Sequence, residues 1–213
     1  MVPIPILDLA LRRGFDLLVS TLTLTLSSPL FLLCVVSTRL LSPGPTFYRA
    51  RRIGQNETVF AMYKFRTMVV DAESIGASLT AYDDPRITPI GRFLRRWKLD
   101  EIPQFINVLK GEMSIIGPRP EAPAYVKHYT KWQKQVLSVR PGITGPAQFV
   151  HRNEEEMLKG QTDPEAFYIT CIMPQKIAID LEYIQKRTLA TDIWWLLKTV
   201  GGLFFLPTRK LKL

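Results

Sequence analysis

The chain has 213 residues, of which 46% are hydrophobic and 22% are charged. This length and balance suit one domain with a core of its own and exclude a disordered or low-complexity chain. The formal net charge of +9 predicts an anionic partner, such as lipid headgroups, phosphate esters or nucleic acid, without choosing among them. The two cysteines, Cys34 and Cys171, have neither a metal-binding spacing nor a disulfide framework, which favours a reducing, cytoplasmic side.

Residues 17–36 form a run of 20 positions without a charged side chain. A helix of that length is long enough to span a bilayer. The run is longer than the apolar region of a signal peptide, and Ser27, Ser28 and Pro29 lie in its middle rather than at a cleavage site at its end. We therefore expect a membrane segment here.

Basic residues flank this segment on both sides, although they usually mark only the cytoplasmic side. A helix broken at Ser28–Pro29 that enters the membrane and returns to the same face satisfies both flanks. Pro29 lacks an N–H and clashes with the carbonyl of Thr25, which is a physical cause for a bend, and the hydroxyls of Ser27 and Ser28 are available to the freed backbone groups. A kinked helix that crosses once remains the alternative. The flanking residues are Arg12 and Arg13 before the run and Arg39, Arg49, Arg51 and Arg52 after it.

The residues that follow predict an α+β fold, mainly helical with a short β-hairpin. A turn cluster at 42–45 ends the membrane segment, and two β-rich runs at 46–51 and 58–65 are separated by Gly54, Gln55 and Asn56. Apolar stripes at helical spacing predict two of the helices. These stripes are Ile102, Phe105, Ile106 and Leu109, and Ile177, Leu181 and Ile184.

The acidic pair Asp100–Glu101 has two interpretations. Since Pro103 is tolerated only in a first helical turn, Asp100 is expected at or near an N-cap, with Glu101 favouring the helix dipole. Alternatively, a carboxylate amid cations stays ionised and acts as a nucleophile or metal ligand, while the same cations neutralise a diphosphate. The nearby cations are Lys64, Arg66, Arg86, Arg92, Arg95, Arg96, Lys98 and Arg119.

Pro118 and Pro120 restrict the backbone on both sides of Arg119, which is a rigid way to present a guanidinium fork to phosphate. Taken alone, this tripeptide is equally typical of a proline-rich surface loop. The three glutamates at 154–156 are expected to form a solvated helix face.

The C-terminal region predicts a helix with apolar side chains at helical spacing beside two tryptophans. Tryptophans at headgroup level and a basic tail suit an amphipathic helix lying in the membrane interface. A helix packed on the protein's own core fits nearly as well. The apolar positions are Ile193, Leu196, Leu197, Val200 and Phe204, the tryptophans are Trp194 and Trp195, and the tail holds Arg209, Lys210 and Lys212.

Five motifs, in this order along the chain, resemble those of the bacterial sugar transferases, the monotopic phosphoglycosyl transferases that begin polysaccharide, O-antigen and glycoprotein-glycan assembly. The resemblance runs from about Arg12 almost to the C-terminus, and the chain looks like the short form of the family, which is essentially the catalytic unit. Departures such as Glu112, where aspartate is common, do not touch the expected chemistry. The motifs are KFRTM at 64–68, DPRIT at 84–88, LDEIPQ at 99–104, GEMSIIGPRP at 111–120 and RPGITG at 140–145.

The resemblance implies a re-entrant membrane helix with basic flanks over residues 1–41, broken at Ser28–Pro29. It implies that residues 42–213 form a cytoplasmic catalytic domain resting on the membrane interface, as one integrated domain with the helix. The expected location is the inner (cytoplasmic) membrane, with the catalytic domain on its cytoplasmic face.

The resemblance also implies the transfer of a sugar-1-phosphate from a UDP-sugar to undecaprenyl phosphate. Asp100 is expected to attack the phosphorus that bears the sugar, which forms a covalent phosphosugar intermediate and releases UMP. Mg²⁺ is expected to bridge Asp100 and the diphosphate, with Glu101 in a supporting role. The phosphate and nucleotide contacts are assigned to Lys64, Arg66, Arg119 and Arg140.

Two other classes of function fit part of the sequence. A membrane scaffold without catalytic activity would recruit later glycosyltransferases, but the intact Asp100–Glu101 pair argues against it. A nucleic-acid-binding protein would need aromatic stacking platforms or a basic helix face, whereas these arginines gather around an acidic pair. We therefore expect no nucleic-acid partner. A homodimer is compatible with the sequence, which does not identify the sugar.

Overall fold

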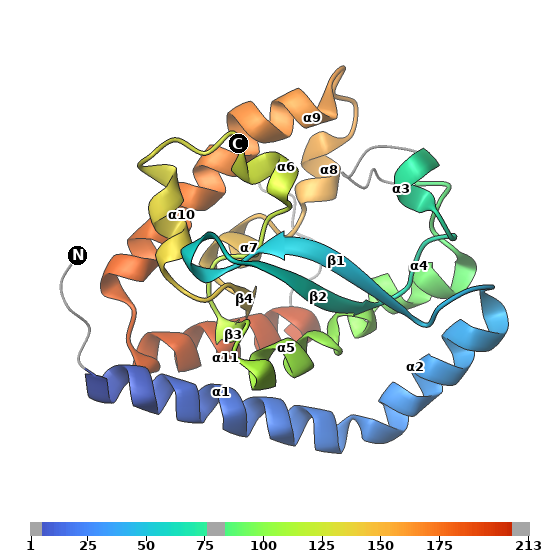
Figure 1. Ribbon diagram of the computed structural model, residues 1–213, viewed down its shortest axis with the longest axis horizontal. Helices are drawn as coiled ribbons and strands as arrows, with labels where there is room; N and C mark the ends of the chain where they lie inside the picture. Colours follow the sequence, from blue (N-terminus) through green and yellow to red (C-terminus); the bar gives the residue numbers. More distant parts are fainter. Residues whose placement is uncertain (1–5, 76–83, 206–213) are drawn as a thin grey trace.

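The computed structural model describes residues 6–75 and 84–205, and within them helices predominate, so the predicted α+β class is confirmed. Helices α1 (Ile6–Leu26) and α2 (Ser28–Leu41) run along the lower edge in Figure 1, below a central hairpin of β1 (Phe47–Ile53) and β2 (Val59–Phe65). The other elements surround the hairpin, some above and beside it and some between it and α1. They are α3 (Ala72–Ile75), α4 (Pro89–Arg96), the 3₁₀ turn η2 (Leu99–Glu101), α5 (Gln104–Lys110), β3 (Ser114–Ile116), α6 (Pro123–Val126), the 3₁₀ segment η3 (Gln133–Ser138), β4 (Gly142–Thr144), α7 (Pro146–Val150), α8 (Glu154–Leu158), α9 (Pro164–Phe167), the π-helical turn η4 (Tyr168–Ile172), α10 (Met173–Lys186) and α11 (Leu189–Phe205).

The apolar N-terminal segment is a pair of helices bent by 63°. The bend falls at Ser27, between the two helices, and Pro29 lies in the first turn of α2, where its missing N–H costs no helical hydrogen bond. The Ser27 hydroxyl makes no capping hydrogen bond, so it does not supply the backbone partner that the sequence suggested. Within the described residues, no single helix is both long and apolar enough to cross a membrane, whereas α1 and α2 together meet that length and composition.

Buried polar contacts fasten the first half of α1 to the rest of the chain. The Arg12 guanidinium donates to Asp192 on α11 at 2.7 Å and to the Tyr183 hydroxyl at 3.1 Å, and Tyr183 donates to Asp192 in turn. Four residues further along, Asp16 accepts hydrogen bonds from Ser114 on β3. The spacing of four puts both contacts on one face of α1. This face therefore lies against the domain.

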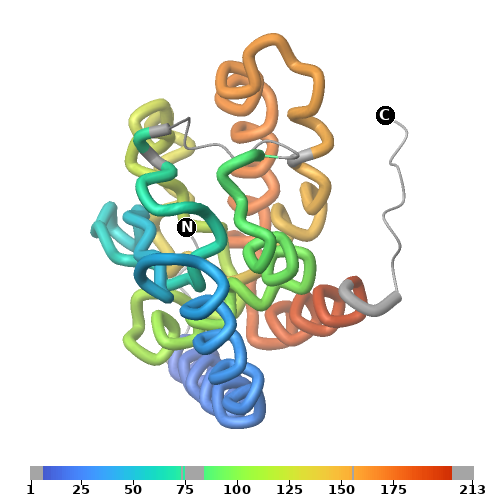
Figure 2. The backbone as a smooth tube through the Cα atoms, turned by 90° about the vertical axis from the view of Figure 1, so that its right-hand side faces the viewer, coloured from blue at the N-terminus to red at the C-terminus, as the bar shows by residue number. Residues whose placement is uncertain are grey.

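The far end of α2 is also held by a buried arginine. The Arg66 guanidinium, just beyond β2, donates to the carbonyl oxygen of Ser42 at 2.7 Å and to its hydroxyl at 3.0 Å. Phe31 on α2 packs its ring against Phe65 on β2, with ring centroids 5.0 Å apart. Both ends of the bent pair thus contact the same domain, and Figure 2 shows α1 beneath it from a second direction.

The hairpin directs one cationic side chain toward the interior. β1 and β2 pair antiparallel from Phe47 opposite Phe65 to Ile53 opposite Val59, close to the predicted runs. Side chains alternate between the two faces of a strand, so Lys64 points to the same face as the buried Met62. The Lys64 side chain therefore lies on the face of the hairpin that packs against the core.

A second, parallel pair of strands, β3 and β4, was not predicted because each has only three residues. The backbone of β4 also lies very close to Gly117, the residue after β3. A Cβ atom on Gly142 would lie 2.1 Å from the nitrogen of Gly117, so only glycine fits at this contact. This close contact fixes the position of the segment after β3, and that segment contains Arg119.

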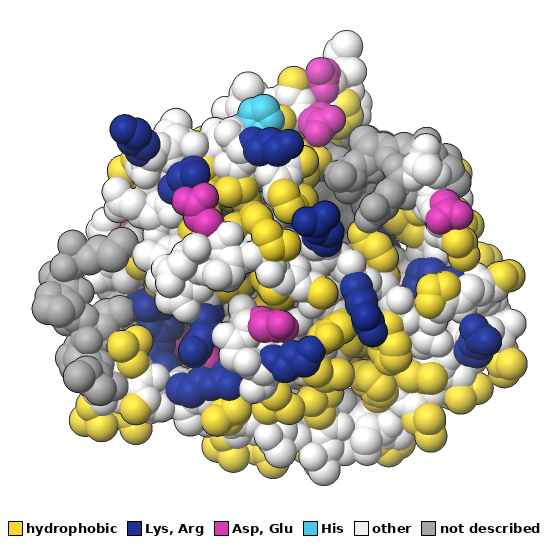
Figure 3. All heavy atoms as spheres, in the orientation of Figure 1, with side chains coloured by type: hydrophobic (Ala, Val, Ile, Leu, Met, Phe, Trp, Pro, Cys, Tyr) yellow, Lys and Arg dark blue, Asp and Glu magenta, His cyan; other side chains and the backbone are white. Residues whose placement is uncertain are grey.

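The C-terminal helix α11 has one face packed on the core and apolar side chains exposed on another, so each of the two interpretations of its sequence fits part of it. Trp195 and Leu196 pack against the main core, whereas Ile193, Trp194 and Leu197 are exposed. The side chain of Phe204 and the basic tail at 209–212 lie outside the described residues. α11 packs beside α1, and hydrophobic side chains gather along the lower and right-hand rim in Figure 3, over α1 and α2.

Removal of the Arg12 guanidinium should destabilise the protein. Arg12→Ala leaves the buried Asp192 carboxylate without its cation, a change that typically costs about 3–5 kcal/mol. We expect a clearly lower Tm in detergent. The matched control is Lys186→Ala, which removes an exposed pair with Glu182 and should leave Tm nearly unchanged. Equal Tm values for the two variants would contradict the anchoring role of Arg12.

Candidate active site

The acidic pair lies in a tight turn between two helices. Lys98, with a left-handed φ of 56°, ends the segment after α4, and η2 then carries Asp100 and Glu101. α5 begins only at Gln104, and its N-cap position is occupied by Pro103. The prediction that Asp100 caps this helix is therefore wrong, because the 3₁₀ turn separates it from the helix start. Because Asp100 does not cap the helix, its carboxylate is available for other chemistry.

Four of the predicted site residues do come together. The Lys64 ammonium lies 3.2 Å from Oε1 of Glu101 and 3.9 Å from Oδ2 of Asp100. The Arg119 guanidinium donates to the same Glu101 oxygen at 2.7 Å. Residues from β2, η2 and the segment after β3 therefore form one cluster of two carboxylates and two cations.

The two carboxylates of the cluster differ in their surroundings. Burial raises the pKa of Glu101, but Arg119 and then Lys64 outweigh this effect and hold the net pKa well below its usual range. Asp100 is only 5% exposed, and burial raises its pKa, with Lys64 opposing and Glu101 reinforcing the shift. The cations therefore act more strongly on Glu101 than on Asp100, which lies further from Lys64.

The same contacts also shift the pKa values of the two cations, in opposite directions. Glu101 raises the pKa of Arg119, whereas burial lowers the pKa of Lys64 against the attraction of Glu101. Arg119 is only partly buried, between Pro118 and Pro120, and the backbone carbonyl of Glu121 accepts from the N–H of Ile53 at 3.0 Å. The loop that carries Arg119 is thus tied to the end of β1.

Two predicted phosphate-binding arginines are not brought into this cluster. Arg66 is turned toward Ser42, as described above, and serves the junction of α2 with the hairpin. Arg140 makes no side-chain hydrogen bond or ion pair with any residue that the structure describes, and its backbone lies beside Gly117. Their contacts with phosphate stay predictions.

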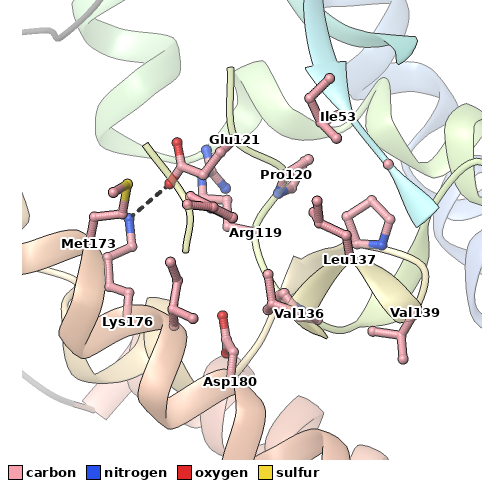
Figure 4. A pocket seen from close by; sticks show the side chains of 15 residues that line it. Ile53, Arg119, Pro120, Glu121, Val136, Leu137, Val139, Met173, Lys176 and Asp180 are labelled. Carbon is pink, nitrogen blue, oxygen red and sulfur yellow. Dashed lines mark hydrogen bonds and ion pairs between the residues drawn. The ribbon is translucent and has the colours of Figure 1, made fainter. Parts of the chain in front are cut away.

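A second polar network lies on the far side of the Arg119 loop (Figure 4). Lys176 on α10 donates to Glu154 at 2.8 Å and to Glu121 at 3.5 Å, and the Tyr168 hydroxyl donates to Glu121. Glu154 is therefore an ion-pair partner of Lys176 and not the fully solvated residue that the sequence predicted. Neither the lysine nor the tyrosine had been singled out, since isolated polar residues on helices carry no chemical pattern.

Beside this network is a small cavity of about 20 Å³, lined by Arg119, Glu121, Lys176 and Asp180 among others. Such a volume holds about one water molecule. Burial raises the pKa of Asp180 to about 7, an effect that the N–H of Ala147 opposes. The network holds the Arg119 loop against α10, and the cavity is too small for a sugar ring.

The prediction that Asp100 holds a metal ion can be compared with the surroundings of its carboxylate. No group of three or more His, Cys, Asp or Glu side chains is arranged to hold a metal within residues 6–75 and 84–205. However, Oδ1 of Asp100 is buried and accepts no hydrogen bond. Mg²⁺ commonly binds one or two carboxylates together with substrate phosphates and water, so this oxygen fits a site that a diphosphate completes.

Two amide side chains on the buried face of α5 were missed by the sequence analysis. Asn107 accepts from the N–H of Tyr63 at 2.9 Å and donates to the carbonyl of Ala61 at 2.8 Å, which fastens α5 to the edge of β2. Gln104 is completely buried one turn earlier, next to the acidic turn. Gln104 falls within a motif that carried the resemblance, but nothing in the sequence indicated its burial.

Comparison with known proteins identifies a family that matches most of the chain. The sequence pattern of the bacterial sugar transferase family matches residues 7–205. The UDP-N-acetylgalactosamine-undecaprenyl-phosphate N-acetylgalactosaminephosphotransferase of Aeromonas hydrophila is 37% identical over 193 residues, which cover 89% of this chain and 43% of the relative. The UDP-glucose:undecaprenyl-phosphate glucose-1-phosphate transferases of Escherichia coli and Caulobacter vibrioides are 38% and 36% identical, over 86% and 94% of this chain.

The extent of the match differs among these relatives. The chain spans about two fifths of the length of the Aeromonas and Escherichia proteins, at 43% and 38%, and 73% of the Caulobacter protein. The match to the family pattern includes all the motifs and the bent helix pair. The chain therefore belongs to the bacterial sugar transferase family.

Proposed function

We propose that this protein transfers a sugar-1-phosphate from a UDP-sugar to undecaprenyl phosphate and releases UMP, as the first membrane step of polysaccharide or glycoconjugate assembly. The observation that carries the proposal is the cluster of the buried Asp100 with Glu101, Lys64 and Arg119, whose two cations can bind a diphosphate. Three relatives are named as undecaprenyl-phosphate sugar phosphotransferases, and this chemistry fits a site with a carboxylate nucleophile.

The reaction proceeds in two displacements at one phosphorus. Oδ2 of Asp100, the oxygen that faces Lys64, attacks the phosphorus that bears the sugar, and the P–O bond to UMP breaks. UMP leaves with the electron pair of that bond, and the sugar-phosphate remains on Asp100 as an acyl phosphate. An oxygen of undecaprenyl phosphate then attacks the same phosphorus, which frees the carboxylate and forms undecaprenyl diphosphosugar.

Arg119 and Lys64 bind the diphosphate in this proposal. Without substrate, both cations contact Oε1 of Glu101, whose single negative charge offsets only one of theirs. A diphosphate offers more negative charge and more acceptor oxygens than one carboxylate, so it competes for the outward-facing Arg119. Glu101 then supports the site by holding both cations at the correct position.

Mg²⁺ is the cofactor that the proposal includes, with Asp100 as its protein ligand through the free oxygen Oδ1. When bound, it supplies positive charge that favours the ionised form of Asp100 and offsets its repulsion of the diphosphate. This charge would add to that of Lys64, which lies 3.9 Å from Asp100 and opposes the effect of burial on its pKa.

We also propose that α1 and α2 form a re-entrant membrane helix and that the domain rests on the cytoplasmic face of the inner membrane. Two observations support this: both ends of the pair are fastened to one domain, and apolar side chains around the bend are exposed, with Leu26 at 79%. The apolar surface continues close to η2. It includes the exposed side chains of Phe93 in α4 and of Trp97, which follows α4. Asp100 then lies near the plane where lipid phosphate and soluble nucleotide meet.

The unaltered protein, in detergent with Mg²⁺ and undecaprenyl phosphate, should release UMP from at least one member of a panel of UDP-sugars. Asp100→Asn should lower this rate by about a thousandfold or more, because the amide keeps the shape but is not a nucleophile. Its Tm should stay close to that of the unaltered protein. Near-normal UMP release by Asp100→Asn would exclude Asp100 as the nucleophile.

Cysteine labelling in intact cells tests the membrane arrangement. In a variant without Cys34 and Cys171, Leu7→Cys and Asn56→Cys should both resist an impermeant thiol reagent until the inner membrane is permeabilised. Leu26→Cys at the bend, which lies in lipid, should resist it in both conditions and serves as control. Labelling at only one of the two flanks in intact cells would show a helix that crosses once.

A further inference from the structure

Gln104 is a buried side chain without an evident structural task. It is the first residue of α5, its exposure is 0%, and neither its Nε2 nor its Oε1 has a hydrogen-bond partner. Buried side-chain amides are nearly always hydrogen-bonded in folded proteins, so an exception calls for a reason. An apolar side chain of the same size would fill this space at lower cost.

Asn107, on the same buried face of α5, shows what a structural amide does in this helix. Its Oδ1 accepts from the Tyr63 N–H, and its Nδ2 donates to the Ala61 carbonyl and to Glu112 at 2.7 Å. The backbone of β2 and the side chain of Glu112 thus provide partners for both the oxygen and the nitrogen of the Asn107 amide. Gln104 lies about one turn earlier and forms no such contact, although it is equally buried.

The complementary group lies four residues before Gln104. Asp100, Gln104 and Val108 are all buried, and Ile102 and Pro103, which link η2 to α5, have right-handed helical φ and ψ, so the spacing of four places the three side chains near one face of the segment. Oδ2 of Asp100 faces Lys64, whereas Oδ1 is buried and accepts nothing. A partnerless donor and a partnerless acceptor therefore stand one turn apart.

We propose that Gln104 is a positioning residue for Asp100: when the donor substrate binds, the Nε2–H of Gln104 donates to Oδ1 of Asp100. This bond fixes the rotation of the carboxylate and directs Oδ2 toward the phosphorus. The proposal rests on the function proposed above. Gln–Asp pairs at this spacing form side-chain hydrogen bonds on helices, and such bonds often tighten only when the substrate is bound.

The arrangement is compatible with Mg²⁺ on the same oxygen. A carboxylate oxygen accepts more than one interaction, and carboxylates that bind metals are commonly held by a hydrogen bond from a neighbouring side chain. Gln104 then acts on the reaction only through Asp100. Its removal should affect the chemical step and not the binding of the nucleotide.

The test is Gln104→Met, which keeps the length of the side chain and removes the donor. With the UDP-sugar that gives the fastest UMP release, kcat should fall by about 10–100-fold, while KM stays within about twofold. Tm should be unchanged or higher, because an unsatisfied amide is replaced by an apolar group. Gln104→Glu, which keeps the shape but replaces the donor with an acceptor next to Asp100, should lose at least as much activity.

Asn107→Leu is the matched control, since it removes the satisfied amide one turn away. It should lower Tm, because the Tyr63 N–H and the Ala61 carbonyl lose their partners. Unchanged kcat in Gln104→Met, or a loss of Tm as large as that of Asn107→Leu, would overturn the positioning role. Absence of UMP release from the unaltered protein would instead overturn the proposed function, and this inference with it.

Discussion

The site depends on how two adjacent carboxylates, the buried Asp100 and the half-buried Glu101, divide their contacts with two cations. Glu101 contacts both Lys64 and Arg119, and these contacts hold its pKa low. Asp100 receives only a distant contact from Lys64, and burial raises its pKa. The two neighbouring acids of this turn therefore differ. Glu101 has a lowered pKa and contacts both cations, whereas Asp100 keeps one oxygen, Oδ1, without a partner. Pairs of carboxylates whose surroundings separate their pKa values commonly divide the roles of a reaction between them.

A second set of buried charges fixes the position of this site relative to the bent helix pair. Arg12 and Asp16 fasten α1 to α11 and β3, and Arg66 fastens the end of α2 to the hairpin. β2, which ends one residue before Arg66, also carries Lys64 into the cluster. The bent helix pair and the acidic turn are therefore held by one framework of short contacts. In the proposed function, this framework sets the depth of Asp100 relative to the lipid phosphate.

Sequence patterns predicted the elements that have strong local signals. The hairpin, the bend near Pro29 and the stripe of α10 follow from turn residues, proline chemistry and apolar spacing. The cluster of Lys64, Glu101 and Arg119 was expected through motifs, since its members lie up to 55 residues apart in the sequence. The difference between Asp100 and Glu101 could not be predicted from the sequence. It depends on their distances from the Lys64 ammonium, which are 3.9 Å for Asp100 and 3.2 Å for Glu101. Arg66 was assigned to phosphate on its charge and motif alone, whereas its contacts in the fold are with Ser42. The missing partners of Gln104 likewise appear only once the packing is known.

The stereochemistry at phosphorus tests the covalent role of Asp100 most directly. A UDP-sugar with a sulfur atom at one non-bridging position of the sugar-bearing phosphorus makes that phosphorus chiral. Each in-line displacement inverts its configuration, so two displacements through Asp100 restore it. The account predicts undecaprenyl diphosphosugar with retained configuration. An inverted product would show a single direct displacement by the lipid phosphate and would reduce Asp100 to a ligand of the metal.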